Sequence, residues 1–178
     1  RPGEGAVKNL AHYSPLMRQL LSARGIESAE DASAFFAPDY ERDVHDPFLL
    51  LHMDTAIARI IKALDAGEHI RVFSDFDADG IPAAVLMNDL FKKLAHENFS
   101  VKIPHRNTEG FGLNERAVAS AIEENVNLLI TLDCGTGDAV HVEALMNAGI
   151  DVIITDHHKE GLTVPSAYAI VNPNQEGD

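Results

Sequence analysis

The hydrophobic pattern of the chain changes its period once, near residue 68. Before that point, apolar residues recur at three- and four-residue spacing, which predicts helices around Leu16–Leu21 and Ala56–Leu64. A capping-box pattern that begins at Ser28 predicts another short helix. Residues 37–53 contain two prolines and are expected to form a connection. We therefore predict a small helical segment over residues 1–68.

After residue 68, short apolar runs alternate with helical patterns. The runs predicted as strands are Ile70–Ser74, Val101–Ile103, Leu128–Leu132, Val152–Thr155 and Ala167–Val171. The helices predicted between them cover residues 81–95, 114–124 and 138–148. Nearly continuous apolar strands separated by helices indicate parallel pairing with both faces of the sheet covered. We therefore predict a doubly wound α/β domain over residues 69–178, with a mainly parallel five-stranded sheet.

Composition limits the class of protein. The chain has 178 residues, 46% of them hydrophobic, and its 28 acidic residues outnumber 14 basic ones for a net charge of −14. This apolar content predicts an ordinary folded core, and the apolar runs are far shorter than the ~20 residues of a membrane span, so we expect no membrane partner. The negative charge disfavours broad binding of polyanions, so contact with nucleic acid should be local or metal-mediated. A single cysteine, Cys134, excludes an intrachain disulfide and a cysteine-based zinc cage, and fits a reducing compartment.

Acidic and imidazole side chains follow three of the predicted strands. They are Asp75, Asp77 and Asp79 after the first strand, Asp133 after the third, and Asp156, His157 and His158 after the fourth. Ligands of open α/β sheets bind outside the carboxyl ends of the strands, so we expect these side chains to converge on one crevice. Clustered carboxylates repel one another unless cations neutralise them. A pair of Mn²⁺ or Mg²⁺ ions is the simplest resolution, with zinc as an alternative.

Each motif also has a purely structural interpretation. The Asp-x-Asp-x-Asp-Gly run from Asp75 is typical of turns and calcium loops, but Leu86 stands where an EF-hand needs its acidic twelfth ligand. Asp133 alone could cap a helix. Adjacent His157 and His158 cannot both hide in one apolar face. Their joint position at strand ends favours phosphoester hydrolysis, in which two metals clamp a phosphoryl group and activate water.

The loop after the second predicted strand, residues 104–112, is a candidate phosphate-binding segment. Arg106 can hold a phosphate by a bidentate contact, and His105 is a second candidate for substrate binding. The alternative is a solvated connection with an aromatic anchor. Cys134 lies within the candidate site but lacks a catalytic partner, so we expect it to be a small packed residue.

Taken together and in order, these motifs resemble those of the DHH phosphoesterase superfamily, and within it the RecJ-like single-strand-specific exonucleases. The matching stretches are Asp75–Gly80, Pro104–Arg106 with Glu109–Gly112, Asp133–Gly135 and Asp156–His158. The helical stretch over residues 21–60 also resembles the N-terminal region of the RecJ-like group. The resemblance extends over residues 14–174.

This resemblance implies a divalent-metal-dependent exodeoxyribonuclease that degrades single-stranded DNA from 5′ to 3′ in DNA repair and recombination, in the cytoplasm. It implies metal ligation by Asp77, Asp79, Asp133 and His157. It implies catalytic, ligating or orienting roles for Asp75, Asp156 and His158. His158 and Arg106 would stabilise the charge that develops on phosphate oxygens. A single-strand-binding protein is an expected partner.

Family members continue beyond these motifs, which shapes the remaining expectations. They carry a further acidic ligand, a DHHA1-type domain that closes over the substrate and, in the RecJ-like group, an OB-fold. We expect this chain to be a fragment without those domains, binding metal weakly and cleaving DNA slowly or not at all. Alternatives are a DHH phosphodiesterase acting on short oligonucleotides or cyclic dinucleotides, and an inactive DHH-fold replication scaffold. The RecJ-like helices argue against the former and the complete carboxylate set against the latter.

Overall fold

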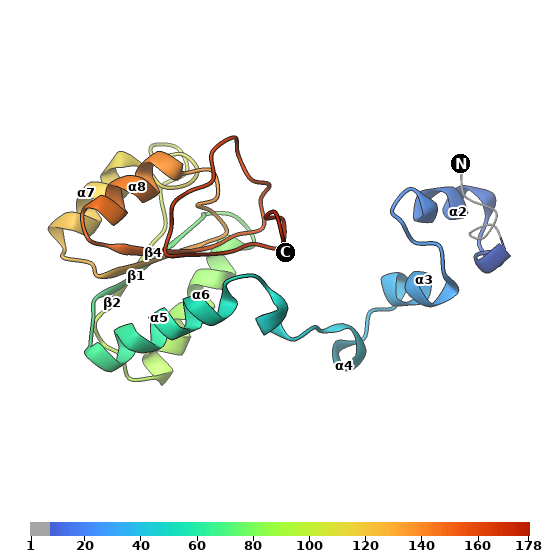
Figure 1. The fold of residues 1–178 in the computed structure, drawn as a ribbon, viewed down its shortest axis with the longest axis horizontal. Coiled ribbons are helices and arrows are strands. Elements are labelled where there is room, and N and C mark those ends of the chain that lie inside the picture. The colour runs from blue at the N-terminus through green and yellow to red at the C-terminus, as the bar shows by residue number, and fades with distance from the viewer. Residues whose placement is uncertain (1–7) are drawn as a thin grey trace. The chain divides into compact units, whose positions relative to one another are not determined.

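The computed structural model describes residues 8–178. The chain forms two compact units, and the boundary between them in the sequence lies between Asp46 and Pro47. The first unit contains the helices α2 (Pro15–Ser22), α3 (Ala29–Phe36) and α4 (Tyr40–Asp43) (Figure 1). The side chains of Ser14 and Ser28 accept hydrogen bonds from backbone N–H groups and cap α2 and α3. Leu10, Leu21 and Ala32 form its small core.

The second unit is built on a five-stranded, fully parallel sheet in the order β2-β1-β3-β4-β5. Its strands are β1 (Ile70–Ser74), β2 (Phe99–Lys102), β3 (Leu128–Leu132), β4 (Asp151–Thr155) and β5 (Ala169–Val171). Its helices are η1 (Pro47–Leu49), α5 (Met53–Ala66), α6 (Gly80–Lys93), α7 (Glu115–Glu123) and α8 (Ala139–Asn147). Figure 1 shows α5 and α6 on one face of the sheet, and α7 and α8 on the other. The predicted doubly wound α/β fold is therefore confirmed.

The alternation of side chains along each buried strand divides the core into two layers. Ile70 and Val72 of β1 pack with α5 and α6, whereas Phe73 packs with α7 and α8. Every residue of β1 and β3 is buried, because helices cover both faces of the central strands. This buried centre makes the carboxyl ends of β1 and β3 a rigid base for side chains that follow them.

Helix α5 belongs to the sheet unit, although its sequence places it in the helical segment predicted over residues 1–68. Ala56 and Ala63 lie in the core below the sheet, where their small side chains let α5 approach β5 closely. Buried Arg59 donates to Asp151 at 2.6 Å and to Glu68 at 2.7 Å, which joins α5 to β4 and to the residues before β1. The compact unit spans Pro47–Asp178 and therefore contains α5 together with the domain predicted over residues 69–178.

The strand order sets the position of the candidate site. Strand β1 pairs with β2 on one side and with β3 on the other, so the chain continues in opposite directions across the sheet from β1. This reversal leaves a crevice at the carboxyl ends of β1 and β3. Within residues 8–178, no helix is both long and apolar enough to cross a membrane.

Candidate functional site

Three aspartates continue the strand ladder by one residue and meet at the carboxyl edge of the sheet. Asp75 follows β1, Asp133 follows β3 and Asp156 follows β4. The N–H of each donates to the backbone carbonyl of the adjacent strand, at 2.9–3.1 Å. Pairing between the parallel strands thus places the first residue of each of these loops beside the first residue of the loop that follows the neighbouring strand. The sheet brings together the three strand-end motifs predicted to converge.

The loop after β1 folds back against its own strand. The N–H groups of Asp79 and Gly80 donate to the carboxylate of Asp77 at 3.3 and 3.2 Å, and Ser74 Oγ donates to the Gly80 carbonyl at 2.6 Å. A Cβ on Gly80 would lie 2.4 Å from the carbonyl oxygen of Asp75, so glycine is required for this close approach. This turn presents Asp77 and Asp79 at the mouth of the crevice.

The His157 ring joins the loops that follow β1, β3 and β4. Its Nε2 lies 2.9 Å from Asp133 Oδ1 and 3.4 Å from Asp79 Oδ2. The side chain of Asp133 is largely buried, whereas His157 and Asp79 remain more than half exposed. The four residues predicted as metal ligands, Asp77, Asp79, Asp133 and His157, therefore lie together.

Asp156 orients the histidine pair instead of facing the crevice freely. Its Oδ1 accepts from the N–H groups of His157 and His158 and lies 2.7 Å from His158 Nδ1, and its Oδ2 accepts from the Thr136 N–H at 3.0 Å. Burial raises the pKa of Asp156, but these hydrogen bonds outweigh that effect and hold the pKa below its ordinary value. The hydrogen bond between His158 and Asp156 raises the pKa of His158.

Two asparagines after β5 support the histidine loop from below. Asn172 is fully buried and donates to the His158 carbonyl at 2.8 Å and to Thr136 Oγ1 at 3.0 Å. The side chain of Asn174 donates to the carbonyl of His157. Neither residue was predicted from the sequence, although the rule that ligand-site residues follow parallel strands applies to β5 as well.

The donor set fits a pair of divalent cations. Asp75, Asp77 and Asp133 form one group and Asp133, His157 and His158 a second, and within each group the potential ligand atoms lie within 4.8 Å of one another. Among the described residues, no hydrogen-bond donor reaches the buried oxygens Asp75 Oδ1 and Asp133 Oδ2. Buried acceptors without donors are costly, and a cation would satisfy them. Oxygen-rich sites with one or two imidazoles suit Mn²⁺ or Mg²⁺.

Burial, charge and hydrogen bonding within the cluster shift the pKa values of Asp133 and Asp77. Burial, the adjacent Asp77 carboxylate and the negative charge of Asp79 raise the pKa of Asp133 to about 6. Hydrogen bonding with Asp79 and with the Gly80 N–H lowers the pKa of Asp77 to about 2. The two carboxylates behave as a pair in which the more buried group holds its proton longer. A bound cation would remove the reason for that proton.

The loop between β2 and α7 contributes a cation, Arg106, that lies over an aromatic ring. The Arg106 guanidinium carbon lies 5.2 Å from the centre of the Phe76 ring, and Phe76 lies 4.7 Å from Phe111. Phe76 stands between Asp75 and Asp77, in the loop after β1, which we call the acidic loop. The acidic loop itself therefore supports Arg106. The Phe111 side chain is 72% exposed. Arg106 was predicted from the sequence but the ring beneath it was not, because ring stacking has no signature in residue spacing.

The same loop is anchored at its far end and closed on itself near its start. The N–H of Leu113 donates to Asp138 Oδ2 at 2.7 Å, and the positive φ of Gly112 brings the backbone against that carboxylate. The contacts of His105 lie within the loop, since its N–H donates to Glu109 at 2.7 Å and its ring contacts Thr108. The structure thus places Arg106 on the acidic loop but does not bring His105 to it. Cys134 is buried, as expected for a packed residue, and burial raises the pKa of its thiol.

Residues 69–178 match the DHH family, N-terminal domain. Among curated proteins, the chain is 38% identical over 180 residues to the single-stranded-DNA-specific exonuclease RecJ of Bacillus subtilis, covering 99% of this chain and 23% of that protein. It is 35% identical over 167 residues to the RecJ of Escherichia coli, covering 92% of this chain and 28% of that protein. The chain therefore spans about a quarter of the length of these relatives.

Solved structures show the same similarity in three dimensions. A crystal structure of exonuclease RecJ bound to manganese matches with a TM-score of 0.69 at 32% identity, over 76% of this chain and 34% of that one. A structure of RecJ from Thermus thermophilus in complex with Mn²⁺ matches with a TM-score of 0.62 at 28% identity, over 95% of this chain and 22% of that one.

Proposed function

Because this chain belongs to the DHH family, we propose that it carries the metal-dependent catalytic site of an exonuclease that cleaves single-stranded DNA from 5′ to 3′ in repair and recombination. The observation that carries this proposal is the pair of ligand groups sharing Asp133 at the ends of β1, β3 and β4. The relatives named single-stranded-DNA-specific exonuclease and the manganese-bound RecJ structures support it.

We assign the cations, two Mn²⁺ or Mg²⁺ ions, to the crowded carboxylates. Asp77, Asp79, Asp133 and His157 are the proposed ligands, because they lie together and because no donor among residues 8–178 reaches one buried oxygen of Asp133. Asp75 also has such an oxygen and lies within ligand distance of Asp77 and Asp133. When bound, two such ions supply Lewis-acid stabilisation of the phosphoryl group and activate water.

The residues around the cations bind and orient the phosphate. Arg106, supported by the Phe76 ring, is positioned to donate two hydrogen bonds to phosphate oxygens. His158 contacts Asp156 through Nδ1, which leaves Nε2 to donate to the phosphate or leaving oxygen. We keep His105 as a substrate-binding candidate through the loop that it shares with Arg106.

An exposed aromatic ring beside the cluster suits an unpaired strand. Phe111 lies against Phe76 and exposes most of its side chain, so a base splayed from a single strand can stack on it. Bases of an intact duplex are already stacked and paired. This contact supports single-stranded DNA as the substrate.

The test is an end-specific cleavage assay on the natural protein that contains this chain, with Mn²⁺ present. Single strands labelled at the 5′ or at the 3′ end are compared with a blunt duplex of the same sequence. We expect the 5′ label to be released first as mononucleotide, and the duplex to be cut at least about tenfold more slowly. Equal cleavage of duplex and single strand, or first release of the 3′ label, contradicts the proposal.

The proposed partner and location follow from the substrate. Single strands exposed during repair are covered by a single-strand-binding protein, so we propose contact with such a protein in the cytoplasm. Adding the single-strand-binding protein of the same organism to the cleavage assay is expected to change the rate at constant DNA concentration. An unchanged rate over the full range of coverage would argue against the contact.

A further inference from the structure

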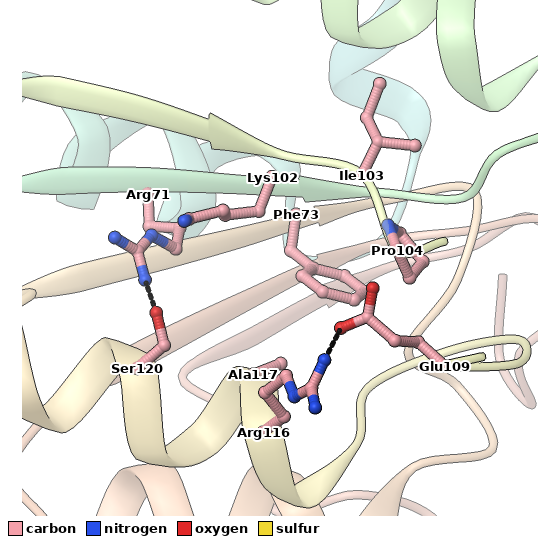
Figure 2. Close-up of a pocket in the computed structure, with 9 residues that line it drawn as sticks. All are labelled: Arg71, Phe73, Lys102, Ile103, Pro104, Glu109, Arg116, Ala117 and Ser120. Carbon is pink, nitrogen blue, oxygen red and sulfur yellow. Dashed lines mark hydrogen bonds and ion pairs between the residues drawn. The ribbon is translucent and has the colours of Figure 1, made fainter. Parts of the chain in front are cut away.

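A second cavity, of about 320 Å³, lies behind the loop that carries Arg106. Figure 2 shows its two walls: Arg71, Phe73 and Lys102 project from the sheet, and Arg116, Ala117 and Ser120 project from α7. We call this cavity the basic pocket. The loop after β2 separates it from the acidic cluster, since Pro104 and Glu109 line the basic pocket while Phe111 and Gly112 line the crevice of the acidic cluster.

Three cations gather in the basic pocket, although the chain carries a net charge of −14. Arg71 is 1% exposed and fully engaged, because its guanidinium donates to Ser100 and Ser120 at 3.0 Å and to the carboxylate of Glu124. It forms a fixed polar wall. A buried arginine that is already paired is a structural element of the pocket, not a free ligand for an anion.

The other two cations are held only loosely. Lys102 Nζ lies 3.9 Å from Glu124, and Arg116 Nη1 lies 3.8 Å from Glu109. Both distances exceed the range of a hydrogen bond. The side chains of Lys102 and Arg116 are 51% and 79% exposed, so solvent screens their attraction to these carboxylates. An anion that reached both would exchange long contacts for hydrogen bonds.

Apolar residues also line the basic pocket. Phe73 and Pro104 are buried, and Ile103 and Ala117 are further apolar lining residues. Figure 2 places the Phe73 ring and Pro104 next to Glu109, on the side of the pocket away from the guanidinium of Arg71. A ligand that fits must therefore combine an anionic group with a flat or apolar body, in a volume suited to a small molecule.

We propose that the basic pocket binds a nucleoside 5′-monophosphate, the class of product that the proposed exonuclease releases. Its phosphate dianion contacts Lys102 and Arg116, and its base lies against Pro104 and Phe73. The identity of the ligand rests on the proposed function, whereas the binding itself does not. Glu109 also accepts from the His105 N–H at 2.7 Å, so a phosphate that displaces Glu109 from Arg116 acts on the loop that carries Arg106.

Calorimetric titration with thymidine 5′-monophosphate at low ionic strength in EDTA tests this proposal, because EDTA removes the cations through which the acidic cluster would hold a phosphate. We expect saturable binding that weakens at least about tenfold in Lys102→Gln and in Arg116→Gln. Lys93→Gln, which removes a positive charge from α6, and Asp133→Asn, in the acidic cluster, should bind as the wild type does. Circular dichroism and the urea midpoint verify that each variant is folded.

Two further ligands identify the group that is recognised. Thymidine should not bind, and inorganic phosphate should bind at least about tenfold more weakly than the nucleotide. Absence of nucleotide binding, binding unaffected by both pocket variants, or binding lost in Asp133→Asn overturns the proposal, and equal affinity for inorganic phosphate overturns the assignment to a nucleotide. A protein that cleaves single-stranded DNA but fails this titration refutes the basic pocket alone. A protein that passes it without cleaving DNA refutes the proposed function alone.

Discussion

The Nε2 atom of His157 lies 2.9 Å from Asp133 Oδ1, which closes the loop after β4 directly onto the loop after β3. The residues are neighbours only because β3 and β4 pair in parallel, with Leu132 opposite Thr155. Asp133 itself adopts a left-handed backbone conformation, with φ 60°, that is strained for a residue other than glycine. Strain, burial and like charge meet at this aspartate, as expected at a functional site.

The first prediction is that Asp133 stabilises the metal-loaded state at the expense of the metal-free one. With its pKa raised to about 6, the folded protein holds a proton that the unfolded chain releases near pH 4, so the stability of the metal-free protein falls as pH rises from about 4 to 6. Asp133→Asn should raise the free energy of unfolding in EDTA at pH 7.5 by on the order of 1 kcal/mol.

Urea unfolding with EDTA or with Mn²⁺ measures this effect. Mn²⁺ should stabilise the wild type but not Asp133→Asn, and the exposed change Glu143→Gln on α8 should alter neither condition. A metal-free Asp133→Asn variant that is less stable than the wild type would contradict the prediction.

Gly80 should tolerate no side chain, because an added Cβ would lie 2.4 Å from the Asp75 carbonyl oxygen. Gly80→Ala is expected to lower the free energy of unfolding by about 1–3 kcal/mol and to weaken Mn²⁺ binding as the Asp77 turn shifts. Gly161, which has open space around its Cβ position and no positive φ, is the matched control. Equal urea midpoints for Gly80→Ala and Gly161→Ala would show that the turn is not tightly packed.

Phe111 should contribute to affinity for DNA and not to stability. Loss of one stacked base weakens binding by about 1–3 kcal/mol, so Phe111→Ala should raise the dissociation constant for single-stranded DNA by roughly 5- to 150-fold. Fluorescence anisotropy with a labelled oligonucleotide measures this change. Leu86→Ala, which removes an exposed apolar side chain from α6, should bind as the wild type does. A similar loss in both variants would argue against stacking.

The pair of Arg71 and Glu124 should make stability depend on acid pH. Hydrogen bonds from Ser120 and Arg71 hold the pKa of Glu124 below its ordinary value. Its contribution is present above the unfolded pKa, near 4.5, and is lost as pH falls through the lower folded pKa. Glu124→Gln should therefore be less stable than the wild type at pH 7, with the difference shrinking below pH 4. A difference that stays constant down to pH 3 would exclude this linkage.

Much of the fold could be predicted because it depends on local pattern. The five strands and the three helices between them follow from apolar runs and from periodicity. The position of α5 could not be predicted, since an amphipathic helix before the first strand fits a separate segment as well as the sheet unit. Its role depends on Ala56, Ala63 and Arg59, whose partners lie far away in the sequence.

The candidate site could also be predicted only in part. The proximity of Asp75, Asp133 and Asp156 could be predicted from the sequence, because parallel strands share one carboxyl edge. The contacts that support these side chains were not predicted. The Phe76 ring beneath Arg106 and the Asn172 side chain beneath His158 depend on side-chain directions in three dimensions. The basic pocket escaped notice because Arg71, Lys102 and Arg116 stand in unrelated elements.

The central claim is that the strand-end cluster is a catalytic metal site, and a paired measurement tests it most directly. Mn²⁺ is titrated by calorimetry into the wild type and into Asp77→Ala, Asp133→Ala and His157→Ala, and cleavage of 5′-labelled single-stranded DNA is measured on the natural protein carrying the same changes. We predict that each change weakens Mn²⁺ binding at least about tenfold and lowers cleavage at least about a hundredfold. Cleavage that survives all three changes would contradict the account.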